Sequence, residues 1–567
     1  MTTLVSLVFA LALLCGVTPA LAQNPAPARN CESSTKDLPG LSLLAVRVGR
    51  LAPGEAACFA LSLRQGEFTR IAVVAEVGYL RGRILDPQGK QLQVTWTSAF
   101  STASPSLPLV IEAPASGAYR LELSVPTWVQ FTNAQSFRVQ MVDWQSEPVR
   151  AAHRQALRRD PRVAWLRNNA RRLRSIDPGD SDYSDLQFLT EVLRDKRVVF
   201  LGEGENGGGS DVLAKTRLVK FLHERMGFDV IAFQAGIHSS TAAWRALQAD
   251  TNPREAVLKS VFGLLARSAQ AEELINYLDA RARTQRPLEL VGFDSQFTGT
   301  AGTTLVPELR AFLAERGVKS ALSDSQAVAA RVLAGTIAGQ FRSGGVVPSL
   351  SDQAQTVEAL RATALEIERV VPDRHGARWA QVLRSTAVQI GLALNNARGV
   401  ASSEYMSGLV RQMADNLIWL VNKAYRDQKV IVWTHTSHAI RNPEATSRGR
   451  IAGHTVGQGL WKVLGSESFA IGLTSYNGRS HWITGADDYY QDLVPGQHPA
   501  IDFESLMVEA GYDIGFVDLR AARSRADWLG GRFVASPLYL VPEEAEWSSA
   551  LDALLFIRTQ EPRTRGR

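Results

Sequence analysis

Residues 197–210 read RVVFLGEGENGGGS, and this stretch indicates the fold of the larger part of the chain. Its short apolar run, residues 198–201, is typical of a buried strand, and the segment that follows has the spacing of a helix. Similar apolar runs lie at residues 230–233, 288–293, 430–433 and 469–473, with helix-period segments between them. Strands and helices that alternate in this way predict an α/β fold with a mainly parallel sheet and flanking helices.

The rest of the sequence divides into regions of different character. Residues 305–421 are rich in Ala, Leu and Arg at helical spacing, and they predict a helical insertion over the active face of this α/β domain, residues 175–562. Residues 41–145 contain short alternating runs separated by turn signals, which predict an N-terminal all-β sandwich domain with an accessory role. A Pro/Ala-rich linker, residues 23–40, precedes this domain, and a helical linker, residues 146–174, follows it.

The first 22 residues have the pattern of a cleavable secretory signal. Residues 4–19 are largely apolar, and the small residues Ala20 and Ala22 precede Gln23. A retained membrane anchor is the alternative, but the apolar run is short for a bilayer span. We therefore expect cleavage after Ala22 and a secreted or periplasmic protein that has no transmembrane anchor after cleavage.

Removal of the signal leaves two cysteines, Cys31 and Cys58. In an oxidising compartment an isolated pair is expected to form a disulfide. That bond would contribute about 3.5 kcal/mol on the chain-entropy estimate. Two buried free thiols are the alternative.

Charge and composition argue against a nucleic-acid partner. The 567 residues carry a net charge of +6, but Lys and Arg are interspersed with Asp and Glu. The densest basic run, residues 167–174, reads RNNARRLR and lacks the aromatic residues that accompany nucleic-acid recognition. We therefore expect a solvated helix face at this run and no nucleic-acid partner.

Polar residues follow four of the predicted strands. They are Glu203 after the first strand, Gln234 after the second, Asp294 after the third, and His435 with His438 after the fourth. Parallel sheets place their chemistry just outside the carboxyl ends of the strands, so these side chains are expected to share one edge. Each of them taken alone could also be a satisfied polar group at a strand end, and that interpretation stays open.

Residues 202–207 have the G-x-G-x-x-G spacing of dinucleotide-binding proteins. That function requires an acidic residue at the end of the second strand, where this chain has Gln234. The loop also carries Glu203 and Glu205, which would repel a phosphate at the helix N-terminus. We therefore do not expect a nucleotide ligand.

The other common catalytic motifs are missing from the sequence. There is no G-x-S-x-G nucleophile elbow and no H-E-x-x-H. A zinc site at His435 and His438 would need two further ligands that the sequence does not identify. We therefore expect no metal and no other cofactor.

Four segments, taken in order, resemble the erythromycin esterase family: VVFLGEGENG, KTRLVKFLHERMGFDVIAFQAG, LVGFDSQ and VIVWTHTSHA. The similarity extends over residues 175–562, which is the predicted α/β domain. The resemblance implies the family's fold and hydrolysis of esters, in its named members the lactone of macrolide antibiotics, with neither a covalent nucleophile nor an obligatory metal. It implies a small-molecule ester or lactone as the substrate, and it gives no ligand for the accessory domain.

Several family positions are retained in this chain. The family's loop glutamate, which orients the base that activates water, corresponds to Glu203. Its histidine pair corresponds to His435 and His438, and the aspartate of its G-F-D segment corresponds to Asp294.

Four other family positions are changed. Asn206 stands where the family has the loop histidine proposed as the base, Ser210 and Gln234 replace glutamates, and Lys215 replaces an arginine. The amides preserve hydrogen bonding but cannot take a proton from water at neutral pH, so the loop base is lost. General-base catalysis contributes about 10²–10⁴-fold, and a retained histidine within reach could restore much of that factor.

Two functions are consistent with this pattern. One is a hydrolase of ester or lactone bonds in which Glu203, His435 and His438 are catalytic, with His435 as the base and His438 orienting it or stabilising the oxyanion. Its substrate-binding residues would be Asn206, Lys215, Gln234 and Asp294. The other is a catalytically inactive protein that binds a small molecule or a glycan in the same cleft.

Overall fold

The computed structural model describes residues 31, 38–75, 79–98, 108–125, 134–249, 251–258, 260–261, 263–341, 346–398, 402–483, 489–520 and 528–566. The predicted signal, residues 1–22, and most of the predicted linker lie outside these residues. The chain forms two compact units, one of Met1–Ser101 with Pro105–Arg150 and the other of Thr102–Ser104 with Ala151–Arg567.

The N-terminal unit is a sandwich of two four-stranded antiparallel sheets, with strand orders β1-β8-β3-β6 and β2-β7-β4-β5. The strands are β1 (Val46–Leu51), β2 (Ala56–Leu63), β3 (Phe68–Ala75), β4 (Tyr79–Leu85), β5 (Gln91–Ser98), β6 (Leu109–Glu112), β7 (Gly117–Ser124) and β8 (Gln135–Gln145). Leu61 in β2, Ile71 in β3 and Phe137 in β8 belong to one core between the sheets, as inward-facing positions of a sandwich do. The turn between β4 and β5 ends at Gly89, whose φ of +82° suits a residue without a Cβ.

Cys31 and Cys58, the pair expected to bond, are joined by a disulfide with their Cα atoms 5.6 Å apart. Cys58 lies in β2 and is fully buried. Arg120 of β7 donates a hydrogen bond to the Cys31 carbonyl oxygen at 2.6 Å. The segment before β1 is therefore fastened to the sandwich both covalently and by this hydrogen bond.

The α/β unit is built on a nine-stranded sheet. Its strands β12, β11, β13, β10, β14 and β19 are parallel neighbours in that order, β16 and β9 continue the sheet antiparallel, and β15 pairs with β14. The strands are β9 (Arg171–Arg172), β10 (Val198–Glu203), β11 (Phe228–Gly236), β12 (Glu289–Asp294), β13 (Lys429–His435), β14 (Ser468–Trp482), β15 (Tyr489–Leu493), β16 (Ile514–Asp518) and β19 (Ala553–Gln560), and a separate small sheet pairs β17 (Phe533–Ala535) with β18 (Glu543–Ala545). The predicted fold class, a mainly parallel α/β sheet preceded by an all-β sandwich, is confirmed.

Helices cover both faces of this sheet. They are α3 (Pro161–Asn169), α4 (Phe188–Val192), α5 (Gly209–Met226), α6 (Ile237–Gln248), α7 (Pro253–Leu258), α8 (Gly263–Ala266), α9 (Glu272–Ala282), α15 (Thr436–Ala439), α16 (Ser447–Ala452), α17 (Val456–Leu464), α18 (Phe503–Glu509) and α20 (Trp547–Ala550), and α2 (Glu147–Arg158) precedes α3. The predicted helical linker is helical in α2 and α3, but its last residues form the short strand β9, which pairs with β16.

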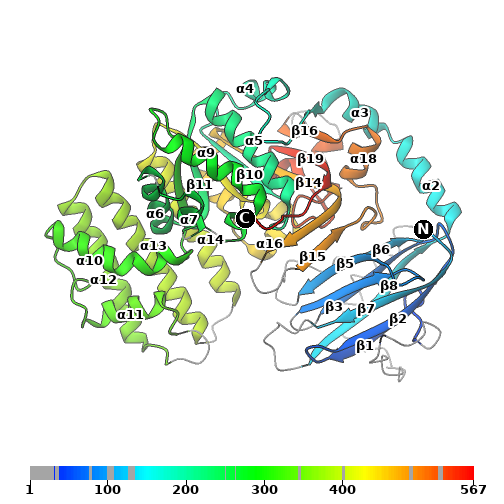
Figure 1. The fold of residues 1–567 in the computed structure, drawn as a ribbon, viewed down its shortest axis with the longest axis horizontal. Helices are drawn as coiled ribbons and strands as arrows, with labels where there is room; N and C mark the ends of the chain where they lie inside the picture. The colour runs from blue at the N-terminus through cyan, green and yellow to red at the C-terminus, as the bar shows by residue number, and fades with distance from the viewer. Residues whose placement is uncertain are drawn as a thin grey trace. The chain divides into compact units, whose positions relative to one another are not determined.

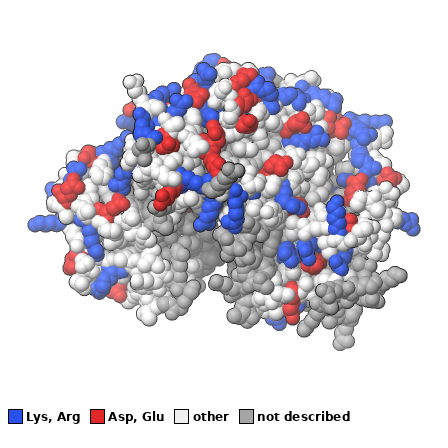
Figure 2. Space-filling model, viewed as in Figure 1, with Lys and Arg blue, Asp and Glu red and all other residues white. Residues whose placement is uncertain are grey.

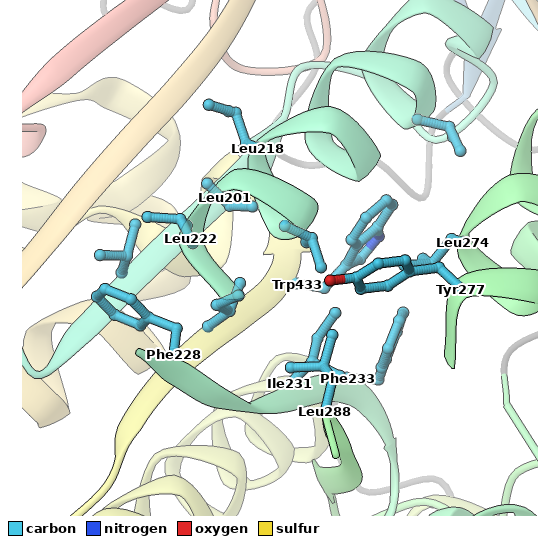
Figure 3. Close-up of a cluster of buried hydrophobic side chains, with 14 of the residues drawn as sticks. Leu201, Leu218, Leu222, Phe228, Ile231, Phe233, Leu274, Tyr277, Leu288 and Trp433 are labelled. Atoms are coloured by element: carbon cyan, nitrogen blue, oxygen red, sulfur yellow. The ribbon is translucent and has the colours of Figure 1, made fainter. Parts of the chain in front are cut away.

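The core has two layers because successive side chains of a strand point to opposite faces. In β10, Leu201 packs with Leu218 and Leu222 of α5 on one face of the sheet (Figure 3). Val198 and Phe200 point to the other face, into a cluster that includes residues of α14, α17 and α18. Burial of each such side chain contributes about 1.5–3 kcal/mol.

The predicted helical insertion consists of α10 (Leu305–Glu315), α11 (Val328–Ile337), α12 (Leu350–Val370), α13 (Arg374–Ala397) and α14 (Ser402–Trp419). Helices α10 to α13 are grouped beside the sheet (Figure 1), around a core of their own that includes Leu309, Leu333, Leu360 and Leu383. On the face drawn in Figure 2, Lys and Arg are interspersed with Asp and Glu over the α/β unit. Within the described ranges, no helix combines the length and the apolar character needed to cross a bilayer.

Candidate active site

A cavity of about 850 Å³ lies at the carboxyl ends of β10, β11, β12 and β13. Of the residues that the sequence proposed as catalytic or substrate-binding, those lining it are Glu203, Asn206, Gln234, Asp294, His435 and His438. Lys215 is fully buried and does not line the cavity. Because parallel strands end at the same edge of the sheet, six side chains from distant parts of the sequence lie together here.

One side of the cavity comes from parts of the chain that the sequence did not point to. Leu258, Val261 and Leu265, from the region of α7 and α8, form an apolar side, together with Phe297 after β12. None of the described residues between 305 and 421 lines the cavity. The region of α7 and α8 thus contributes the apolar side of the cavity, whereas Leu305 and Val382 of the insertion line a smaller pocket that also includes Asp294. That the helical insertion lies over the active face stays a prediction.

Strand register explains the adjacency of the two central side chains. β10 and β13 are parallel neighbours in which Glu203 pairs with His435. Gly202 permits α15 to pack on β10, since a Cβ there would lie 2.7 Å from Thr436 Oγ1 and 2.8 Å from Thr436 Cα. His435 is the N-cap of α15, so the close packing of α15 on β10 also fixes the position of the His435 backbone from which the imidazole extends.

Glu203 is buried between two cations. Its Oε2 accepts a hydrogen bond from Lys215 Nζ at 2.8 Å and lies 3.7 Å from Arg563 Nη2. Burial alone would raise the pKa of this carboxyl, but Lys215 and Arg563 outweigh burial and hold the pKa below its usual value. Glu203 is therefore ionised at neutral pH, and no described residue donates a hydrogen bond to its Oε1.

Lys215 lies behind Glu203 in the core. Its ammonium also donates to the Thr434 carbonyl oxygen at 3.2 Å and lies 4.0 Å from the centre of the Trp433 ring. Burial lowers the pKa of Lys215 to about 8, so the side chain still carries its proton at neutral pH. This position favours a role in holding Glu203, which differs from the substrate-binding role proposed from the sequence.

His435 is held in one plane and in one protonation pattern. The Ser437 backbone N–H donates to His435 Nδ1 at 3.1 Å, and Ser437 Oγ lies 2.9 Å from the same nitrogen. Because the backbone N–H can only donate, Nδ1 is an acceptor and the neutral ring carries its proton on Nε2. The imidazole stacks on Tyr539 with ring centres 4.2 Å apart. Tyr539 and Leu540 have φ of +60° and +53°, and such backbone at non-glycine residues costs about 1–3 kcal/mol each. The surrounding packing therefore holds Tyr539 against His435 despite backbone strain.

His438 and Gln234 form a neutral pair. Thr434 Oγ1 donates to Gln234 Oε1 at 3.1 Å, which leaves Gln234 Nε2 facing His438 Nε2 at 3.4 Å. His438 Nε2 is therefore the acceptor, and burial lowers the pKa of this histidine to about 4. His438 is thus uncharged at physiological pH.

Two further buried carboxyl groups belong to the loop and helix that follow β10. Glu205 Oε1 accepts hydrogen bonds from Trp482 Nε1 and, at 3.4 Å, from the Gly207 N–H. Burial raises the pKa of Glu205 to about 7. Asp211 accepts a hydrogen bond from Gln560 Nε2 at 2.8 Å, and burial raises its pKa to about 6. Both groups brace the loop that carries Asn206.

Asp294 ends β12 and is buried in the cavity floor. One of its oxygens accepts a hydrogen bond from the Gln296 N–H at 3.0 Å, and the other accepts one from Gln296 Nε2 at 3.3 Å. Burial raises the pKa of Asp294. This carboxyl therefore shapes the turn after β12 as well as lining the cavity.

The cavity residues that sequence patterns did not point to include Arg563, Tyr539 and Trp482. Trp482 is the last residue of β14, so its position at a strand end could have marked it. The apolar run that predicts this strand stops at residue 473, however, well before Trp482. Tyr539 lies in irregular chain between β17 and β18, and Arg563 follows the last strand. No periodicity marks either of these two positions.

Comparison with known proteins gives consistent matches. A family model described as Erythromycin esterase matches residues 223–559. The Bacillus subtilis (strain 168) protein named "Putative hydrolase YbfO" is 24% identical over 378 residues, which cover 64% of this chain and 82% of that protein. Erythromycin esterase type II of Escherichia coli is 22% identical over 324 residues, which cover 53% of this chain and 74% of that protein.

A solved structure described as a succinoglycan biosynthesis protein has a TM-score of 0.55 at 17% identity, and the match covers 71% of this chain and 97% of that one. At this identity the likeness concerns the fold alone. The family match extends over more than half of the chain and includes Gln234, Asp294, His435 and His438 at the ends of β11, β12 and β13. By that match, the chain belongs to the erythromycin esterase family.

Proposed function

We propose that this protein hydrolyses carboxylic ester or lactone bonds of a small molecule bound in the cavity, with water as the nucleophile. The observation that carries the proposal is the pairing of Glu203 with His435 at neighbouring strand ends on the cavity floor. Family membership supports an esterase. These two side chains supply what the reaction needs, an acceptor for a proton of water and a donor to the ester group.

Glu203 is the residue suited to receive the proton. It is ionised, and its Oε1 receives no hydrogen bond from a described residue. As the water oxygen bonds to the carbonyl carbon, one water proton passes to Oε1. When the tetrahedral intermediate collapses, the ester C–O bond breaks and that proton passes to the leaving oxygen. Because the pKa of Glu203 is low, we expect a weaker base than histidine and slow turnover.

His435 takes a role different from the base expected from the sequence. Since Nδ1 accepts the Ser437 N–H, the neutral imidazole carries an N–H on its buried Nε2 and has no lone pair there. We infer that His435 donates this N–H to the reacting ester group. The stacked ring of Tyr539 keeps the imidazole in the plane from which it can do so.

The remaining lining favours a substrate with a large apolar body. Phe233, Trp433, Trp482 and Tyr539 provide aromatic surface, which binds apolar groups with little loss of side-chain entropy. The neutral polar side chains Asn206 and Gln234 fit uncharged groups of such a substrate.

Ester hydrolysis by the purified protein tests this proposal. The panel contains 4-nitrophenyl acetate, longer aryl esters and lactones, with Glu203→Gln and His435→Gln beside the wild type. We expect kcat/KM to fall about a hundredfold or more in both variants, in line with the loss of a base or an oxyanion donor. His223→Gln is the matched control, because His223 is buried outside the cavity and bonded to Tyr277, and its kcat/KM is expected to stay within about threefold.

A catalytically inactive binding protein is the second candidate. The observation that favours it is the neutral character of three cavity side chains, because amides occupy positions 206 and 234 and burial lowers the pKa of His438 to about 4. This function predicts that a bound lactone is recovered intact after long incubation, as mass spectrometry would show. Turnover that is absent in the wild type, or equal in wild type and both variants, would favour binding over hydrolysis.

We also propose that the protein is exported after cleavage following Ala22. The disulfide between Cys31 and Cys58 supports this, because disulfides persist in oxidising compartments. The mass of the mature protein from the native host is the test. A chain that begins at Gln23 and fractionates outside the cytoplasm is expected, whereas a cytoplasmic chain that retains residues 1–22 would contradict the proposal.

A further inference from the structure

The chain does not stop at the last strand but continues across the loop that follows β10. Residues 561–566 run from the end of β19 back toward the middle of the α/β unit (Figure 1). The Gly209 N–H donates to the Glu561 carbonyl oxygen at 2.7 Å, and the Arg563 N–H donates to the Gly207 carbonyl oxygen at 3.0 Å. The Ala269 N–H donates to the Thr564 carbonyl oxygen at 2.8 Å. Backbone hydrogen bonds on both sides of Arg563 therefore fix where its side chain leaves the backbone.

The Arg563 side chain is a buried cation that lines the cavity. Its exposed fraction is 2%. Its Nε lies 3.5 Å from the Gly208 carbonyl oxygen, and its Nη2 lies 3.7 Å from Glu203 Oε2. Neither terminal nitrogen donates a hydrogen bond to a described residue. A guanidinium has five N–H donors, and those at the tip of Arg563 are open to the cavity, where a ligand with anionic oxygens can accept them.

The nearby carboxyl groups are already engaged by other donors. Glu203 Oε2 accepts the closer hydrogen bond from Lys215. Asp211 is bonded by Gln560, and Glu205 is bonded by Trp482. These carboxyl groups offset the charge of Arg563 in part, but they do not use the N–H groups at its tip.

We propose that Arg563 is the anion-binding cation of this cavity and that it acts beside His435 on the reacting ester group. In the proposed hydrolysis, on which this role in catalysis rests, it binds the ester carbonyl oxygen and stabilises the negative charge that develops there as water adds. The position suits that task, because Nη2 is close to the carboxylate that receives the water proton. A guanidinium can hold two oxygens in a fixed fork, and such donors act strongly where water is excluded.

Two readouts test this role, and one of them does not depend on turnover. The first is the affinity for phenylphosphonate, an anionic analogue of the tetrahedral intermediate, measured by calorimetry. Arg563→Gln is expected to lose at least about tenfold in affinity, as loss of a charge-assisted hydrogen bond does. The second is hydrolysis of 4-nitrophenyl acetate, where kcat is expected to fall about 10²–10³-fold with a much smaller change in KM.

Arg245→Gln is the matched control, because Arg245 is exposed, pairs with Glu308 and does not line the cavity. Its phenylphosphonate affinity and kcat are expected to stay within about threefold of the wild type. Near-ultraviolet circular dichroism checks that Arg563→Gln is folded. Should that variant not fold, Arg563→Lys decides, because it keeps the charge but lacks the fork and is expected to bind phenylphosphonate with intermediate affinity.

The outcomes separate this inference from the proposed function. Phenylphosphonate binding that is weakened in Arg563→Gln but not in Arg245→Gln supports the anion site, even if no ester is hydrolysed. Hydrolysis absent from the wild type as well removes the proposed function alone. Equal phenylphosphonate affinity of wild type and Arg563→Gln, equal affinity of wild type and Arg563→Lys, or no binding by the wild type, overturns the assignment of Arg563.

Discussion

Substitution of Lys215 by Met tests how the buried carboxylate is held in the fold. The variant would leave Glu203 with Arg563 as its remaining cation, at 3.7 Å. The pair that is removed is 2.8 Å long, and its side chains are only 0% and 9% exposed. Breaking such a pair on one side costs about 3–5 kcal/mol, whereas removing both charges together can be close to neutral. We expect Lys215→Met to lower the free energy of unfolding of the α/β unit by about 3 kcal/mol, because Arg563 remains, and the double variant with Glu203→Gln to recover most of this loss.

The loss of stability in Lys215→Met is expected to depend on pH. In the wild type the pKa of Glu203 is depressed below 4.5, so its ionisation stabilises the fold above that pH and the contribution is lost as the pH falls through the folded-state pKa. In Lys215→Met, burial would dominate and raise the pKa of Glu203 above 4.5. Its ionisation would then destabilise the variant as the pH rises through the raised pKa. The difference in stability between the two proteins should therefore be larger near pH 7 than near pH 5.

Urea unfolding of the wild type, the two single variants and the double variant gives the coupling energy of the pair. The expected coupling is about 2 kcal/mol or more at pH 7, and smaller at pH 5. If the stability changes of the two single variants sum to that of the double variant within about 0.5 kcal/mol, the reasoning is refuted, because the two charges would then contribute independently. A coupling that is the same at both pH values would contradict the account of the Glu203 pKa.

Three further predictions concern other parts of the structure. Gly202→Ala is expected to lower the melting temperature of the α/β unit, because its Cβ would lie 2.8 Å from the backbone of α15; Gly391→Ala in α13 meets nothing closer than 3.9 Å and should instead raise the free energy of unfolding by about 0.5–1 kcal/mol. Gln234→Glu would place a carboxylate beside His438 and should raise the pKa of that histidine from about 4 toward its usual range, as an NMR titration of the ring would show; an unchanged pKa would contradict the neutral pair. Cys58→Ser should lower the free energy of unfolding of the sandwich unit by about 3–4 kcal/mol in urea, and reduction of the wild type should lower it by the same amount. An unchanged stability after reduction would contradict a contribution of the disulfide.

Much of the fold follows from local patterns in the sequence. The apolar runs at residues 198–201 and 430–433 become adjacent parallel strands, because a strand buried on both faces needs side chains that are apolar throughout. The floor of the cavity follows from the same rule. Parallel strands end at one edge, so Glu203, Gln234 and Asp294 meet there although the sequence separates them widely.

How deeply a side chain is buried and which way it points could not be predicted in the same way. Lys215 is on the face of α5 that packs on the sheet, and only the packing shows that it lies behind Glu203 and not on the cavity wall. The protonation pattern of His435 depends on the contacts of its Nδ1 with the backbone N–H and the hydroxyl of Ser437, which no sequence pattern reports. Arg563 lies in irregular chain after β19, where neither strand nor helix periodicity applies.

The two cations beside Glu203 differ in what they can do because they differ in their other contacts. Lys215 is enclosed by Glu203, the Thr434 carbonyl oxygen and the Trp433 ring, so its N–H groups are used within the fold. Arg563 approaches the same carboxylate only to 3.7 Å and lines the cavity. Loss of Lys215 should therefore appear in the free energy of unfolding, and loss of Arg563 in phenylphosphonate affinity and kcat. If the two substitutions exchanged these effects, the C-terminal segment would be what holds Glu203, and the anion site would belong to Lys215.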